Sequence, residues 1–339
     1  MTTAIELSHV TKTYRRKRRS RRLWQNLIRP QYEHHEALHD MSFTVPTGQI
    51  MGYIGPNGAG KSTTIKLMTG ILQPDKGSCR VLGVNPLINR EQFVRQIGVV
   101  FGNRSNLLWD LPVIDSFTMM KTIYEIPAAQ FQRRLTRLTK TIGISDLLSI
   151  PVRQMSLGQR MRCELVVALL HNPQILFLDE PTLGLDAVSK IAMHQFIRRL
   201  NVETGLTVVL TTHDMGDIRE LADRIIVVGK GIKLYDGQPE TIIRRFADVH
   251  KVTLKTKKNA SILATIHQEW QQCKVIQEFP GLVTLEVADQ QTLETLIPVV
   301  ASHPDVTAYQ VAALSTEEVI ARFYQQAMVK GGVAHAPLS

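Results

Sequence analysis

Apolar runs and helical patterns alternate along the first 236 residues. Short runs of apolar side chains are typical of strands buried on both faces, and apolar residues that recur every three or four positions are typical of helices. Their alternation predicts an α/β fold with a mostly parallel sheet covered on both faces. The predicted strands are residues 4–10, 37–45, 50–54, 78–82, 97–101, 174–179, 207–212, 225–229 and 232–235.

The helical patterns of this first region are unevenly distributed. They dominate from about residue 103 to 170, which predicts an inserted helical subdomain there. The predicted helices are residues 63–68, 91–96, 127–142, 160–170, 187–200 and 215–221.

The pattern changes after residue 236. Residues 237–329 read as strand, helix, strand, strand, helix and strand, followed by a last helix from residue 316 to 327. This order predicts a small α+β domain, with a ferredoxin-like arrangement as one interpretation. It carries no cluster of catalytic residue types, so we expect an accessory or regulatory domain. We expect the tail, residues 330–339, to be disordered.

One glycine-rich loop between the predicted strand 50–54 and the predicted helix 63–68 carries the clearest chemistry. Gly55, Gly60, Lys61 and Ser62 match the phosphate-loop pattern G-x-x-x-x-G-K-[ST]. Glycines let successive N–H groups turn toward a phosphate, and the start of a helix favours anions. Lys61 would neutralise the β- and γ-phosphates, and the Ser62 hydroxyl would bind Mg²⁺.

Two carboxylates follow the apolar strand 174–179. Asp179 ends that strand, where ligands gather in open α/β sheets, and it can reach Mg²⁺ through water. Glu180 follows directly and could polarise the water that attacks the γ-phosphate. An Asp-Glu pair after a strand by itself indicates helix or turn capping, but beside a phosphate loop the catalytic interpretation is preferred.

The remaining motifs resemble those of ATP-binding cassette (ABC) proteins. Residues 155–159, Met-Ser-Leu-Gly-Gln, resemble the family's LSGGQ signature, although Met155 replaces its leucine and Leu157 its first glycine. Residues 179–186 resemble the Walker B motif and D-loop, and His213 resembles the switch histidine. Tyr14 matches the aromatic residue that stacks on adenine. The motifs occur in family order, so the resemblance covers about residues 4–235.

This resemblance implies a phosphate-loop NTPase (RecA-like) core with an antiparallel β subdomain, and an ATP sandwich between two subunits. The phosphate loop of one subunit and the signature of the other would enclose ATP and Mg²⁺, with Ser156 and Gly158 contacting the γ-phosphate in trans. His213 would hold the γ-phosphate and the water, and Asp186 would link the two sites. The implied ATP-binding residues are Tyr14, Gly55, Pro56, Asn57, Gly58, Ala59, Gly60, Lys61, Ser62, Thr63, Asn103, Ser156, Gly158, Gln159 and Asp186; the implied catalytic residues are Lys61, Glu180 and His213; and the implied Mg²⁺ ligands are Ser62, Asp179 and Asn103.

One departure from the family affects the site. The family carries a glutamine after the strand that corresponds to residues 97–101, where this chain has Asn103. Asn103 offers the same amide oxygen on a shorter arm, so it is either a Mg²⁺ ligand or a plain loop residue. The apolar segment 107–113 that follows lies where the family faces its transport partner, and packing within the helical subdomain is the alternative.

Composition and charge limit the classes of partner that the chain is expected to bind. The chain has 339 residues, a net charge of +10 and a pI near 9.6, which favours an anionic partner. No apolar run reaches the length of a membrane span, no signal peptide is visible, and three scattered cysteines suggest a reducing compartment. A basic insertion, residues 15–36, contains an amphipathic pattern at 23–28 that either rests on an anionic membrane or is a solvated loop.

The resemblance leads to a first function and its rivals. We expect an ATP-hydrolysing subunit on the cytoplasmic face of the cell membrane, paired with a second copy of itself or a homologous subunit, that energises export through separate ABC-2-type permease subunits. The substrate is not encoded in this chain. One rival is a soluble ABC ATPase that acts on nucleic acid or ribosomes; nucleic acid is not expected, because two cassettes, a coiled coil and zinc cysteines are missing from the sequence. The other rival is an importer ATPase.

Overall fold

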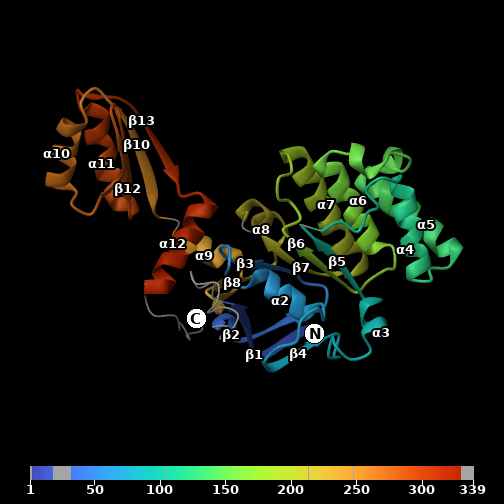
Figure 1. The fold of residues 1–339 in the computed structure, drawn as a ribbon. Coiled ribbons are helices and arrows are strands. Elements are labelled where there is room, and N and C mark those ends of the chain that lie inside the picture. Colours follow the sequence, from blue (N-terminus) through green and yellow to red (C-terminus); the bar gives the residue numbers. More distant parts are fainter. Residues whose placement is uncertain (1, 18–31, 103, 213, 247, 330–339) are drawn as a thin grey trace, which may run out of the picture. The chain divides into compact units, whose positions relative to one another are not determined.

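The computed structural model describes residues 2–17, 32–102, 104–212, 214–246 and 248–329, which divide after Gly237 into two compact units (Figure 1). Each unit is described by itself. None of the helices in these residues combines the length and the apolar character needed to cross a membrane.

A six-stranded sheet runs through the first unit in the order β5-β6-β7-β3-β8-β9 (Figure 1). Every neighbouring pair is parallel except the β8–β9 hairpin, so the predicted α/β sheet is confirmed. β3 and β7 are buried at every position, which explains the apolar run of β3 and of residues 208–210 in β7. The strands are β3 (Ile50–Ile54), β5 (Ile97–Phe101), β6 (Ile175–Asp179), β7 (Thr207–Thr212), β8 (Arg224–Gly229) and β9 (Ile232–Gly237).

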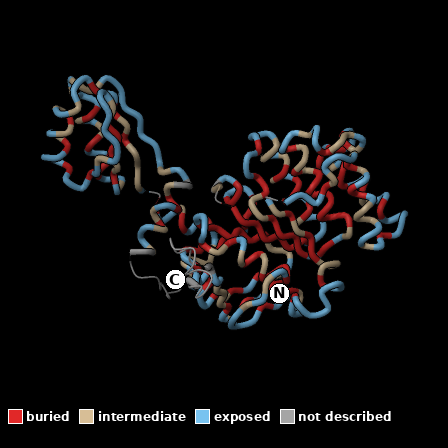
Figure 2. The backbone as a smooth tube through the Cα atoms, viewed as in Figure 1, coloured by how far each residue is buried: buried red, intermediate tan, exposed pale blue. Residues whose placement is uncertain are grey.

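A smaller antiparallel sheet, of order β2-β1-β4, packs with helix α2 against one face of the large sheet. The shared core includes Tyr53 of β3, Ile65 of α2 and Phe177 of β6, all fully buried. Buried positions run along the strands of the large sheet (Figure 2). The opposite face is closed by other helices, since Gly52 of β3 lies beside Ile218 of α8. The elements are β1 (Thr3–Lys17), β2 (Tyr32–Pro46), β4 (Lys76–Val81), α2 (Lys61–Met68) and α8 (Met215–Leu221).

Helices dominate between β5 and β6, as the sequence predicts for about residues 103–170. In α5 the buried residues Phe131, Leu135, Leu138 and Ile142 recur at helical spacing and form its inner face. The helices of the first unit, besides α2 and α8, are α3 (Arg90–Val94), α4 (Val113–Ile123), α5 (Ala128–Ile142), α6 (Leu157–Leu169) and α7 (Ala187–Thr204), with short 3₁₀ turns at Ser145–Leu147 and Val152–Gln154.

The basic insertion starts later than its sequence suggests. β1 and β2 continue as a paired ladder in which Tyr14 lies opposite His35 and Lys17 opposite Tyr32. Backbone hydrogen bonds sustain such a two-stranded arm, so it needs no apolar face, and polar residues 12–17 hide it in the sequence. The amphipathic helix predicted at 23–28 lies outside the described residues, as does the predicted disordered tail at 330–339.

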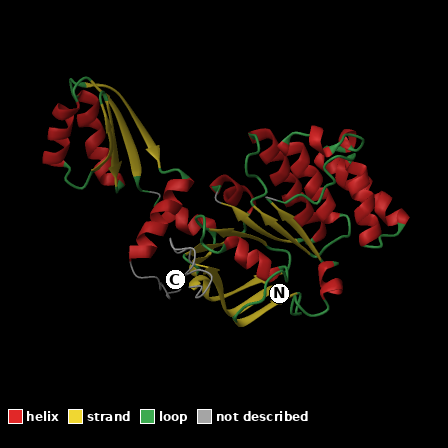
Figure 3. Cartoon of the chain, viewed as in Figure 1, coloured by secondary structure: helices red, strands yellow, loops and turns green. Residues whose placement is uncertain are grey.

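The second unit contains a four-stranded antiparallel sheet of order β11-β12-β10-β13 (Figure 3). Its β-α-β-β-α-β sequence is the predicted ferredoxin-like order, with α10 and α11 between the strands. Val252, Leu285, Ile262 and Leu296 belong to its separate core. The elements are α9 (Pro239–Arg245), β10 (His250–Thr256), α10 (Asn259–Glu269), β11 (Lys274–Phe279), β12 (Leu282–Val287), α11 (Gln290–Ser302), β13 (Val306–Ala313) and α12 (Thr316–Val329).

Candidate nucleotide-binding site

The phosphate loop joins β3 to α2 in a shape that requires its glycines. Gly60 has a φ of 103°, and a Cβ there would lie 2.6 Å from the carbonyl oxygen of Ala37. A Cβ on Gly55 would lie 2.6 Å from the carbonyl oxygen of Val228. Pro56, Asn57 and Gly58 form the exposed outer part of the loop. The loop therefore exposes backbone at the start of a helix, as a cradle for an anion does.

Lys61 is folded back over this loop. Its ammonium group donates to the carbonyl oxygen of Gly55 at 2.7 Å and lies 3.6 Å from Oε1 of Glu180. The side chain is only 6% exposed. A buried ammonium group needs anionic or carbonyl partners, so a phosphate in the cradle would find this charge already held beside it.

Asp179 joins the loop to the large sheet. Its Oδ2 accepts a hydrogen bond from the Ser62 hydroxyl at 3.2 Å, and its Oδ1 accepts one from the Thr211 hydroxyl at 2.6 Å. The strand register explains this meeting, because Asp179 ends β6 opposite Thr211 of β7. Mg²⁺ prefers one or two protein oxygens together with phosphates and water, and Ser62 with Asp179 fits that donor set.

Glu180 adopts a left-handed backbone conformation, with a φ of 53°, directly after β6. Its N–H donates to the carbonyl oxygen of Thr211 at 3.0 Å and approaches the Thr211 hydroxyl at 3.2 Å. A left-handed glutamate persists only when its surroundings hold it, and such strain gathers at functional sites. Sequence reasoning missed Thr211; its signal was a hydroxyl side chain near the carboxyl end of a buried strand.

Tyr14 lies at the outer side of the loop helix. Its hydroxyl is 3.3 Å from that of Thr63, and 37% of the residue is exposed. The ring is therefore available beside the phosphate loop, where the stacking role implied by the resemblance requires an aromatic face.

The signature residues form a separate cluster. Ser156 begins α6 with a capping box, in which its hydroxyl accepts from the Gln159 N–H at 3.2 Å and its own N–H donates to Gln159 Oε1 at 2.9 Å. Gly158 packs so closely that a Cβ would lie 2.4 Å from the Ser189 hydroxyl. Hydrogen bonds from the Ser189 N–H and hydroxyl lower the pKa of Asp186, which begins α7.

The structure thus places the expected residues in two groups. Lys61, Ser62, Asp179 and Glu180 meet at the carboxyl edge of the sheet, whereas Ser156, Gly158 and Asp186 gather at the starts of α6 and α7. Asn103 and His213 lie outside the described residues.

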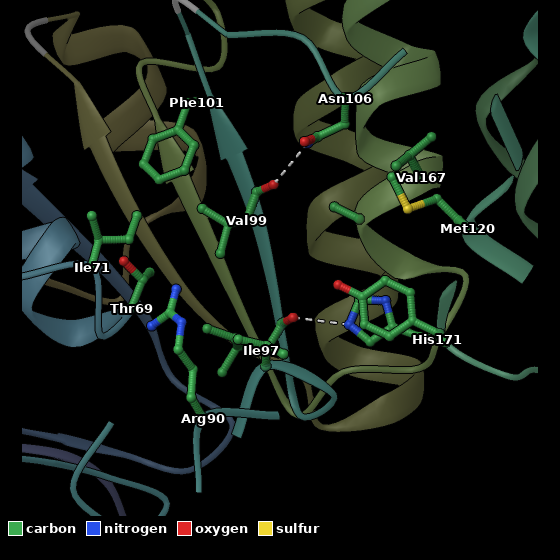
Figure 4. Close-up of a pocket in the computed structure, with 13 residues that line it drawn as sticks. Thr69, Ile71, Arg90, Ile97, Val99, Phe101, Asn106, Met120, Val167 and His171 are labelled. Carbon is green, nitrogen blue, oxygen red and sulfur yellow. Dashed lines mark hydrogen bonds between the residues drawn. The ribbon is translucent and has the colours of Figure 1, made fainter. Parts of the chain in front are cut away.

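A pocket of about 160 Å³ lies elsewhere on the first unit, between β5, α3, α4 and α6 (Figure 4). Arg90, Asn106 and His171 are among its polar lining residues, and Ile97 and Val99 are among its apolar ones. His171 Nε2 donates to the carbonyl oxygen of Ile97 at 2.9 Å, a bond drawn in Figure 4. Asn106 bonds to the Val99 carbonyl oxygen and is itself held by the buried carboxylate of Glu164.

The apolar segment 107–113 divides between interior and surface. Leu107 and Val113 are buried in the helical subdomain, whereas Trp109 is 52% and Leu111 45% exposed. The guanidinium of Arg160 lies 5.7 Å from the centre of the Trp109 ring. Two large apolar side chains therefore remain on the surface.

Comparisons with known proteins give consistent matches. Residues 38–183 match the family model described as ABC transporter. The chain is 32% identical over 216 residues to the Nod factor export ATP-binding protein I of Ralstonia nicotianae, covering 64% of this chain and 67% of that protein. It is 34% identical over 213 residues to the methionine import ATP-binding protein MetN 2 of Enterococcus faecalis, covering 62% and 61%.

A solved structure is similar as well. The dimeric post-hydrolysis state of the ATP-binding cassette MJ0796 bound to ADP and Pi aligns with a TM-score of 0.58 at 26% identity, covering 69% of this chain and 98% of that one.

Proposed function

The chain belongs to the ABC transporter family, as an ATP-binding subunit and ATPase, and from this premise we propose that it energises export through separate membrane permease subunits. The observation that carries its ATP-hydrolysing part is the convergence of Lys61, Ser62, Asp179 and Glu180 at one edge of the sheet. A charge partner, a metal ligand pair and a carboxylate beside them form a site for γ-phosphate hydrolysis.

Different residues of the chain bind the phosphates, the metal, the attacking water and the adenine. The loop backbone and Lys61 bind the phosphates, and Ser62 with Asp179 would hold Mg²⁺, which would neutralise part of the phosphate charge. Glu180 orients and polarises the attacking water, because its fixed backbone keeps the carboxylate beside Lys61. Tyr14 supports the adenine.

The second group of residues supports a dimer. Asp186 bonds to Ser189 and Gly158 packs against the same serine, while Ser156 is exposed at the start of α6. We assign their phosphate contact to the site of a second subunit, either another copy or a homologous chain. The dimeric form of the similar cassette MJ0796 supports this assignment.

Export is the preferred direction, since the chain is similar to a Nod factor export protein. Import is the second candidate, because similarity to MetN 2 is of the same order. Both directions require a permease, for which the ABC-2 type remains our proposal.

The permease docks at the pocket of Figure 4 and at Trp109 and Leu111, whose apolar exposure suits a protein contact. The subunit then sits on the cytoplasmic face of the membrane, where the basic insertion 15–36 faces anionic lipid.

The test compares two substitutions at the site with one outside it. Glu180→Gln should still bind ATP, accumulate as an ATP-bound dimer and lose turnover by about 100-fold or more, because general-base assistance contributes that much. Lys61→Ala should weaken ATP binding itself. The control is Glu203→Gln on α7, the same chemical change at a surface ion pair with Arg199.

Calorimetry with Mg-ATP measures binding, and phosphate release measures turnover. Wild-type turnover in Glu180→Gln would remove the catalytic assignment, and unchanged ATP affinity in Lys61→Ala would remove the assignment of the loop.

A further inference from the structure

We infer that Asp217 of α8 is a positioning residue. It fixes the turn that carries Glu180 relative to a second turn, formed by Thr212 and Asp214 on the two sides of position 213. The inference rests on the proposed function, because those two turns are the ones to which hydrolysis is assigned. Asp217 contacts no substrate; it acts through the residues that it binds.

Asp217 is a buried carboxylate with three partners from three elements. It is 1% exposed. Its Oδ2 accepts hydrogen bonds from the hydroxyls of Thr182 and Thr212, the latter at 2.8 Å. Its Oδ1 lies 2.8 Å from Nε2 of His194 on α7. A buried carboxylate is costly unless it is fully bonded, so this set of bonds defines a single geometry.

Thr182 connects the carboxylate to Glu180. It lies two residues after Glu180, in a turn closed by the Leu183 N–H, which donates to the Glu180 carbonyl oxygen at 3.3 Å. Glu180 has a positive φ, which its surroundings must maintain. Thr211 holds this turn from the strand side and Thr182 from the α8 side. Loss of the Thr182 anchor frees the turn to relax.

Thr212 connects the same carboxylate to the neighbouring turn. Its hydroxyl accepts a hydrogen bond from the Asp214 N–H at 2.9 Å, so it bridges the residues before and after position 213. Asp214 in turn pairs with Lys190 of α7. Lys190 and His194 lie four residues apart on α7. The helix therefore contacts the segment after position 213 through Asp214 and the segment before it through Asp217 and Thr212.

The experiment removes one hydroxyl from the network and keeps the size and shape of the side chain that carried it. Thr182→Val should lower kcat for ATP by about ten- to hundredfold, because small misplacements of catalytic groups cost that much. The KM for ATP should change less than about twofold, since the phosphate loop is untouched. Thr182→Ser restores the hydroxyl and should recover most of kcat.

Two further variants separate positioning from stability. Thr139→Val removes a similarly buried hydroxyl, which donates at 2.8 Å to the Leu135 carbonyl oxygen in α5, and it should leave kcat within about twofold. His194→Leu removes the third bond to Asp217 from a less buried position, and it covers the case in which Thr182→Val does not fold. Thermal melting of every variant confirms that folded protein is assayed.

The outcomes are distinct. A loss of kcat with constant KM in Thr182→Val that Thr182→Ser recovers, or the same loss in His194→Leu, supports the inference. Wild-type kcat in each of these two variants that folds, or an equal loss in Thr139→Val, overturns the inference and leaves the proposed function standing. A wild-type chain that hydrolyses no ATP overturns both.

Discussion

His171 should stay neutral far below the pH at which a histidine ordinarily gains a proton. Nε2 donates to the Ile97 carbonyl oxygen, and Nδ1 is buried without a hydrogen-bond partner among the described residues. Protonation would place a second N–H on that buried nitrogen, and the ring lies stacked on Tyr124. Burial lowers the pKa of His171 from 6.5 to about 4, although the bond to Ile97 opposes the shift.

The sign of the stability effect follows from this depressed pKa. Between pH 6.5 and about 4 the unfolded chain binds a proton that the folded chain does not, so the free energy of unfolding falls as pH falls. Above pH 6.5 His171 contributes no pH dependence. At pH 5 the unfolded pKa lies about 1.5 units above the pH, which corresponds to about 2 kcal/mol, and residual solvent contact reduces this to about 1–2 kcal/mol.

The matched variant is His171→Phe, which keeps a ring against Tyr124 and removes the titrating group. It loses the bond to Ile97 at every pH, a constant offset of about 1 kcal/mol. Urea unfolding at pH 7.5, 6 and 5 should give wild type a steeper loss of stability than the variant, by the 1–2 kcal/mol estimated above. Histidine Cε1 NMR signals followed against pH give the pKa directly, with the variant assigning the resonance. A midpoint near 6.5 for His171 would refute the reasoning.

Two other predictions concern partners. Trp109→Ser combined with Leu111→Ser should reduce recovery of the co-expressed permease with the tagged subunit, whereas Val202→Ser, at an apolar residue of α7 that is more exposed than either, should not. Recovery equal to that of the wild type in both variants removes the docking proposal. Deletion of residues 18–31, which leaves the β1–β2 ladder, should weaken flotation with vesicles that contain phosphatidylglycerol but not with neutral vesicles, and undiminished flotation would contradict the lipid role of the insertion.

The sequence predicted the part of the site that depends on backbone shape. Gly55 and Gly60 occupy places where any side chain would collide with a neighbouring carbonyl group, so the motif reports a steric requirement. Asp179 was predicted because it ends an apolar run, and apolar runs reveal strands that are buried on both faces. The same reasoning gave the parallel sheet and the β-α-β-β-α-β order of the second unit.

The contacts around the site could not be predicted in this way. Thr182, His194, Thr212 and Asp217 are polar residues on four separate segments, and only the packing of α7 and α8 beside β7 brings them together. Each residue alone is ordinary for a turn or a helix. The ladder of β1 and β2 beyond residue 10 was missed because its backbone bonds impose no apolar alternation.

Leu157, which replaces the first glycine of the family signature, occupies a position that accepts a side chain. Leu157 is the first residue of α6, where helical backbone suits any residue, and its side chain is 38% exposed. Its Cδ2 lies 3.1 Å from the place of a Cβ on Gly184, so the lack of a side chain at Gly184 makes room for it. The close packing that excludes a side chain is at Gly158, against Ser189. The chain therefore keeps glycine at the signature position where the fold requires it, and the substitution at Leu157 leaves the capping box of Ser156 and Gln159 intact.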